Sequence, residues 1–151
     1  MPFVISSEGN LKRSDTAPSI FLVWLLQRLH RYAPESNMSG TGLLITGGYG
    51  PGLTDLEPFL GPVGPIVAAD SGYDLALVLG LQPDLIVGDM DSVCTTPAPG
   101  ENVRRSSRDK DHTDTELGLQ ALKEFGCDRA VIAGGGGGRL DHLLYIAGMF
   151  E

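Results

Sequence analysis

Two carboxylates separated by one residue, Asp89 and Asp91, are the side chains with the clearest capacity for chemistry. They follow the apolar run 85–88, which predicts a buried strand because Pro83 precedes it and Gly88 ends it. Residues two apart on an extended backbone point the same way, so both carboxylates would lie on one side of the strand's tip. Facing carboxylates repel unless a cation or a proton lies between them. Mg2+ suits such an oxygen-only site and bridges to substrate phosphates; the alternative is a solvated, Asp-rich turn.

Another carboxylate, Asp70, follows a second predicted strand. The apolar residues 65–67 lead into Ala68-Ala69-Asp70-Ser71-Gly72. Small residues at this point let the backbone turn sharply or approach a ligand closely. Asp70 is therefore a candidate site residue, with a turn former as the alternative.

Charged and hydroxyl side chains precede a predicted helix in the segment Lys110-Asp111-His112-Thr113-Asp114-Thr115-Glu116. Apolar residues at 117, 121, 122 and 125 carry the helical pattern, which Gly126 stops. Thr113 or Asp114 would cap this helix. Lys110 would neutralise a phosphate or remain a solvated surface lysine.

A glycine run, Gly134 to Gly138, follows the apolar residues 130–133 and precedes Arg139-Leu140-Asp141-His142. A strand, a glycine loop and a helix start in this order offer free backbone N–H groups and the positive end of a helix dipole to an anion. Arg139 adds a bidentate fork for phosphate. The run lacks the Lys-Ser/Thr ending of a P-loop and is not a dinucleotide fingerprint; the alternative is a flexible connection.

These segments fit one architecture. Predicted strands near residues 43, 66, 85 and 130 alternate with helical stretches near 55, 75, 115 and 142, the rhythm of βαβ units. We expect an α/β fold with a mostly parallel sheet flanked by helices, a Rossmann-like three-layer sandwich. Loops that follow parallel strands lie at one edge of the sheet, where ligands bind. Those loops carry Asp70, Asp89, Asp91, Asp114, Arg139 and Asp141, and Gly47-Gly48 follows the first strand, at 43–46.

The order and spacing of these motifs resemble the catalytic domain of thiamin pyrophosphokinase. The resemblance covers residues 65–150, with a fair match to the first strand from about residue 42. It is carried by Ala69-Asp70-Ser71-Gly72-Tyr73, Gly80-Leu81-Gln82-Pro83-Asp84, Gly88-Asp89-Met90-Asp91-Ser92, the segment 110–116, and Gly137-Gly138-Arg139-Leu140-Asp141-His142. Ser71 departs from the pattern, because the family usually has glycine there.

The resemblance implies transfer of a diphosphate from ATP to the hydroxyl of thiamin, with AMP leaving and Mg2+ as cofactor. Such transfer needs metal ions, positive groups and positioning more than covalent help from the protein. Asp70, Asp89 and Asp91 would bind Mg2+, with Asp114 as a fourth carboxylate; the general base is not assigned. The nucleotide-binding candidates are Gly47, Gly48, Ser71, Gly72, Lys110, Thr113, Gly137, Gly138, Arg139, Asp141 and His142.

Three functions stay open. The first is the thiamin diphosphokinase, which the resemblance implies to be a homodimer. The second is a diphosphokinase for another hydroxymethyl heterocycle, such as a pterin. The third is a non-catalytic nucleotide-binding domain, which the departure at Ser71 favours. It is also favoured because the family's C-terminal β-sandwich domain is absent from this chain, which stops at Glu151.

Composition sets outer limits. A chain of 151 residues suffices for one domain with a sizeable core. A net charge of −8 argues against a nucleic-acid partner. Cys94 and Cys127 form no CxxC motif or disulfide framework, which fits the reducing cytoplasm.

The first 41 residues are expected to form an N-terminal extension, followed by the α/β domain at 42–151. The extension would hold one apolar helix, from Pro18 to Tyr32, and a linker at 33–41. The apolar stretch is too short to span a membrane. It would pack on the domain or on a partner subunit; a signal peptide is the alternative, since Lys12 and Arg13 precede it.

Overall fold

The computed structural model describes residues 3–5, 11–13, 40–60, 64–107, 112–137 and 140–149. The chain divides into two compact units, residues 1–36 and 37–151. In the first unit, β1 (Phe3–Ile5) pairs antiparallel with β2 (Leu11–Arg13), a pairing that the sequence did not predict. The predicted apolar helix at 18–32 and most of the linker at 33–41 lie outside the described residues.

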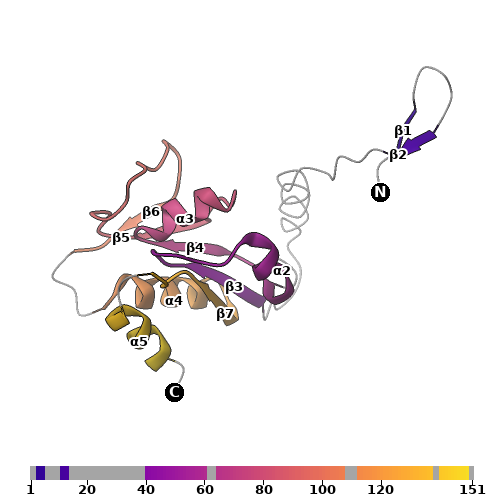
Figure 1. The fold of residues 1–151 in the computed structure, drawn as a ribbon. Helices are drawn as coiled ribbons and strands as arrows, with labels where there is room; N and C mark the ends of the chain where they lie inside the picture. Colours follow the sequence, from indigo (N-terminus) through magenta and orange to yellow (C-terminus); the bar gives the residue numbers. More distant parts are fainter. Residues whose placement is uncertain are drawn as a thin grey trace. The chain divides into compact units, whose positions relative to one another are not determined.

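The second unit is built on a five-stranded sheet in the order β6-β5-β4-β3-β7, and every pair of neighbours is parallel (Figure 1). The predicted α/β fold with a parallel sheet is confirmed. The strands are β3 (Gly40–Ile45), β4 (Ile66–Ala69), β5 (Leu85–Gly88), β6 (Val103–Arg105) and β7 (Cys127–Ala133).

Helices cover both faces of this sheet (Figure 1). On one face lie α2 (Leu53–Leu60) and α3 (Gly72–Val78), and on the other lies α4 (Asp114–Glu124). The last helix, α5 (Leu140–Gly148), runs beside α4. Within the described residues, no helix has the length and apolar character needed to span a lipid bilayer.

The core explains why the strands read as continuous apolar runs. All four residues of β4 and of β5 are buried, because alternate side chains enter opposite layers. Val67 and Val87 pack in a cluster with Leu122 of α4, whereas Ala68 packs with Tyr73 of α3. The tips of both strands are therefore held from two sides.

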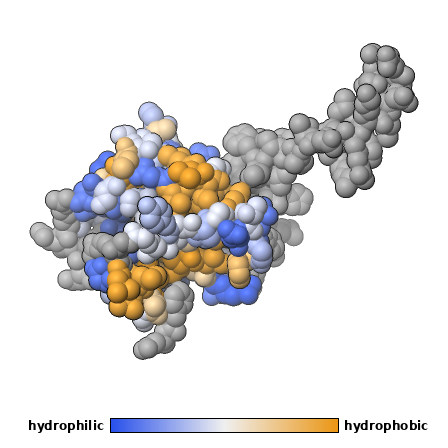
Figure 2. Space-filling view, in the orientation of Figure 1, coloured by the Kyte–Doolittle hydropathy of each residue, from blue (hydrophilic) through white to orange (hydrophobic). Residues whose placement is uncertain are grey.

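Some apolar side chains stay exposed. On α5, only Ile146 is buried among the described residues, while Leu140, Leu143 and Leu144 are exposed (Figure 2). On α3, Val78 is exposed at 83%.

Strand order places a topological switch beside β3. The chain proceeds outward from β3 through β4 and β5 to β6, and then returns to add β7 on the other side of β3. Loops that leave two such neighbouring strands in opposite directions open a crevice at the carboxyl edge, where α/β proteins bind ligands. Here those loops are the glycine-containing ones after β3 and β7.

Candidate active site

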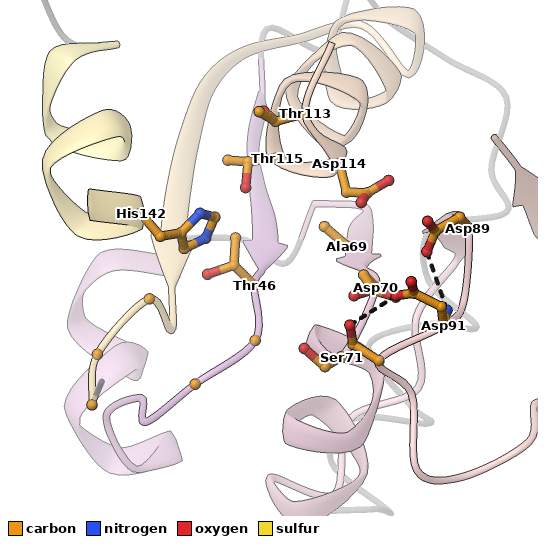
Figure 3. Close-up of a pocket in the computed structure, with 16 residues that line it drawn as sticks. Thr46, Ala69, Asp70, Ser71, Asp89, Asp91, Thr113, Asp114, Thr115 and His142 are labelled. Carbon is orange, nitrogen blue, oxygen red and sulfur yellow. Dashed lines mark hydrogen bonds between the residues drawn. The ribbon is translucent and has the colours of Figure 1, made fainter. Parts of the chain in front are cut away.

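A cavity of about 470 Å3 lies at this edge of the sheet (Figure 3). The loops after β3, β4, β5 and β7 and the starts of α4 and α5 form its walls. Of the residues expected from the sequence, it is lined by Gly47, Gly48, Asp70, Ser71, Asp89, Asp91, Thr113, Asp114, Gly137 and His142.

Three carboxylates converge on one wall of the cavity. One oxygen from each of Asp70, Asp89 and Asp91 lies within 4.8 Å of the other two. The Asp89 carboxylate accepts a hydrogen bond from the Asp91 amide at 3.1 Å, and Asp91 accepts one from the Ser92 hydroxyl at 2.9 Å (Figure 3). An all-oxygen cluster of this kind fits a hard divalent cation.

The proximity of Asp89 and Asp91 has a different origin from the expected one. The strand β5 already ends at Gly88, and Met90 adopts a left-handed backbone with φ of 68°. A tight turn, and not an extended backbone, therefore brings the two carboxylates together. Such a conformation at a residue other than glycine costs free energy, which functional sites commonly tolerate.

Asp70 gives the strongest local evidence for a cation-binding site. Its φ is 49°, and its Oδ1 is the one buried side-chain polar atom without a hydrogen-bond partner among the described residues. Burial raises the pKa of this carboxyl group, hydrogen bonds from Ser92 and from the Ser71 backbone lower it, and the charges of Asp114 and Asp89 raise it further. A bound cation would satisfy the orphaned oxygen and offset the repulsion.

The sequence left open whether Thr113 or Asp114 caps the helix, and the structure gives the two residues different roles. Thr113 is the N-cap of α4: its hydroxyl accepts from the Glu116 amide, and the Glu116 carboxylate accepts from the Thr113 amide at 2.7 Å, forming a capping box. Asp114 is therefore not needed as the cap and accepts from the Ser106 hydroxyl at 3.4 Å. It lines the cavity but does not belong to the group of three close carboxylates, so its role as a metal ligand stays a prediction.

Glu116 also ties α5 to α4. Hydrogen bonds from the Thr113 backbone and from the Tyr145 and Thr113 side chains, helped by the charge of His112, outweigh burial and lower the Glu116 pKa. Tyr145 lies one turn after His142 on α5. The imidazole of His142 points into the cavity toward Thr46 and Thr115, across from the aspartates (Figure 3).

Part of the glycine run is hydrogen-bonded to the loop after β3. The Gly135 amide donates to the Gly47 carbonyl at 2.8 Å, and Gly136 exchanges two hydrogen bonds with Tyr49, at 2.9 and 3.0 Å. These bonds extend the pairing of β3 with β7 into the loops. The expectation of free amide groups is thus wrong for Gly135 and Gly136, whose N–H groups are already used. The flexible-connection alternative stays a hypothesis, although Gly135 and Gly136 are hydrogen-bonded to the loop after β3.

Two further glycines allow close packing around the site. A side chain at Gly72 would collide with the Ile45 carbonyl, and one at Gly47 would collide with the Ser71 hydroxyl. Gly72 does not line the cavity. A glycine is required there because α3 packs closely against β3. Ser71, in contrast, fills space directly beside Gly47.

The remaining expected residues are placed as follows. Asp141 is exposed on the first turn of α5 and does not line the cavity. Lys110, Gly138 and Arg139 lie outside the described residues. Sequence reasoning missed Thr46, Thr115 and Ser92, which line the cavity. Thr46 and Thr115 are buried hydroxyl residues, and their position directly beside predicted site residues was the available signal.

The family model of the thiamin pyrophosphokinase catalytic domain matches residues 63–150, more than half of the 151 residues. The chain belongs to this family. The departure at Ser71 therefore occurs within a catalytic domain of the thiamin pyrophosphokinase family.

Solved structures of this family have the same fold. The thiamin pyrophosphokinase of Geobacillus thermodenitrificans is 30% identical, with a TM-score of 0.56 over 72% of this chain and 53% of that one. The enzyme of Bacillus subtilis is 28% identical, with a TM-score of 0.59 over 72% and 53%. That of Candida albicans, 18% identical over 74% and 52% with a TM-score of 0.55, supports the fold alone. The chain thus spans about half the length of these structures. No curated protein matches it.

We expect Gly134→Ala to destabilise the domain more than Gly126→Ala does. Both glycines have positive φ, 107° and 85°, but only at Gly134 would the new methyl group collide with the Thr46 carbonyl. Strain alone costs about 1–2 kcal/mol at Gly126, and the collision should add at least about 1 kcal/mol at Gly134. Urea unfolding measures both, and equal losses would contradict the close contact of Gly134 with the Thr46 carbonyl.

The raised pKa of Asp70 predicts a pH-dependent cost. Because the folded state holds the proton more tightly, stability is lost as pH rises above the ordinary value of 3.8 and through the folded pKa. Without divalent cations, Asp70→Asn should therefore raise Tm at pH 7, and the difference should vanish in acid. Glu57→Gln, an exposed charge removal on α2, is the control. An unchanged Tm for Asp70→Asn at pH 7 would contradict the repulsive cluster.

Proposed function

We propose that this chain is the catalytic part of a thiamin diphosphokinase, which transfers a diphosphate from ATP to the hydroxyl of thiamin and releases AMP. The convergence of Asp70, Asp89 and Asp91 beside paired glycine loops, in a catalytic domain of this family, carries the proposal. In the reaction, the thiamin oxygen attacks the β-phosphorus of ATP. The bond from that phosphorus to the oxygen bridging to the α-phosphate breaks, and the hydroxyl proton passes to a base that is not assigned.

The residues of the chain supply positioning and charge. Asp70, Asp89 and Asp91 would hold Mg2+, which when bound neutralises phosphate charge and orients the transferred group. The glycine loops leave room for phosphates to approach the backbone closely. Thr113 and Asp114 present the N-terminus of α4 to the same cavity, where its dipole favours an anion. His142 faces the aspartates from the opposite wall (Figure 3).

Several finer assignments belong to this proposal. Lys110 and Arg139 would neutralise phosphate charge, with Gly138, Asp141 and Gly72 near the nucleotide. A cytoplasmic location and a homodimer follow from the resemblance to the family. The division into an extension at 1–41 and a catalytic domain at 42–151 is proposed on the same basis.

The acceptor is tested by supplying the chain with ATP and Mg2+ and measuring AMP by chromatography. We expect AMP and thiamin diphosphate with thiamin, and no AMP with a hydroxymethyl pterin. The reverse preference would identify the second hypothesis. Binding of ATP with Mg2+ but no AMP from any acceptor would mean that the domain is non-catalytic.

Asp91→Asn should abolish turnover while leaving the metal-free Tm unchanged or raised, because it removes a repulsive charge from the cluster. The loss should be at least about 100-fold in kcat, as for other groups that act on transition-state charge. Glu57→Gln should keep full activity. Circular dichroism and thermal melting check the fold, and severe unfolding of Asp91→Asn would mean that Asp91 is structural.

A further inference from the structure

The loop that carries Asp89 and Asp91 is attached to α3 by two neighbouring side chains, Asp74 and Tyr73. Residues 89–102 connect β5 to β6 and contain no helix or strand. Asp74, on the first turn of α3, accepts hydrogen bonds at both of its carboxylate oxygens: from the Cys94 amide at 2.8 Å and from the Thr95 amide at 2.9 Å. A carboxylate that receives two backbone N–H groups makes strong, charge-assisted bonds.

The neighbouring residue holds the far end of the same loop. The Tyr73 hydroxyl donates to the Glu101 carboxylate at 2.7 Å, and the same oxygen accepts from the Ala98 amide at 2.6 Å. Tyr73 itself is only 3% exposed, in the core beneath α3. Two adjacent residues of one short helix therefore fix an otherwise irregular loop at two points.

The helix that holds this loop also begins beside Asp70. Asp70 precedes Ser71, the N-cap of α3, and the Tyr73 amide donates to the Asp70 carbonyl at 3.0 Å. Burial tends to raise the Asp74 pKa, but the bonds from Cys94 and Thr95 lower it overall, so Asp74 is ionised at neutral pH. The positions of all three clustered carboxylates therefore depend on α3: Asp70 directly precedes it, and the loop with Asp89 and Asp91 is hydrogen-bonded to it.

We propose that Asp74 is a positioning residue that keeps Asp89 and Asp91 within reach of Asp70 for a shared divalent cation. The binding of a cation by the cluster rests on the proposed function. The attachment of the loop to α3, here called the clamp, rests on the hydrogen bonds from Cys94 and Thr95 to Asp74, which lie outside the cluster. Repulsion among the three carboxylates pushes the loop away from α3 when no cation is bound. The bonds from Asp74 resist that movement, so the cation does not have to reassemble the site.

The test compares Asp74→Ala, Asp74→Asn and Asp55→Ala in the full chain. Asp55 is a matched control, because it also accepts a backbone amide bond, from Gly52 at 3.1 Å, but on α2. Calorimetric titration with Mg2+ at 0.15 M salt should show about tenfold weaker binding for Asp74→Ala, the size found for residues that support metal ligands. Asp74→Asn, which keeps one acceptor oxygen, should be intermediate, and Asp55→Ala should match the wild type.

Two further readouts separate positioning from general stability. In thiamin turnover, saturating Mg2+ should restore the kcat of Asp74→Ala, so that only the Mg2+ concentration required rises. Without metal, hydrogen exchange over residues 89–95 should increase in Asp74→Ala and not in Asp55→Ala.

Equal Mg2+ affinity for Asp74→Ala and the wild type would overturn the inference, even with a loosened loop. Unchanged exchange over residues 89–95 would overturn it as well. A wild-type chain that binds no Mg2+ would instead overturn the proposed function. Hydrogen exchange over residues 89–95 would then show by itself whether Asp74 holds the loop.

Discussion

Mutual repulsion of three carboxylates is the constraint around which this domain is organised. Asp70, Asp89 and Asp91 would separate in water, yet the fold holds one oxygen of each within 4.8 Å of the others. The neighbouring strands β4 and β5, buried on both faces, fix the ends from which these residues emerge. Left-handed backbone at Asp70 and Met90 adds further cost. Because the fold holds the three carboxylates together despite this cost, the cluster is already arranged to bind a cation.

Much of this arrangement could be predicted because it depends on local sequence. Apolar runs at 66–69 and 85–88 indicated buried strands, and the polar residues after them could be placed at one edge of a parallel sheet. The resemblance to the family added the roles of the residues. A cap at Thr113 or Asp114 was also predicted, and the structure decides for Thr113, whose capping-box partner is Glu116.

What could not be predicted depends on which distant segments meet. The addition of β7 beside β3 uses up the Gly135 and Gly136 amides, and no local pattern encodes that pairing. The strand β5 ends at Gly88, where the apolar run ends, but the expectation extended its backbone to residues 89–91, where Met90 instead forms a left-handed turn. The role of Asp74 could not be predicted, because its partners are backbone amides about twenty residues further along the chain.

The contact between Ser71 and Gly47 has an evolutionary consequence. The serine hydroxyl occupies the space that a side chain at position 47 would need, so the two loops share one small volume. A larger residue at position 47 would require the Ser71 hydroxyl to turn away or the serine to be replaced by a smaller residue. The effect of a substitution at position 47 is therefore expected to depend on the residue at position 71.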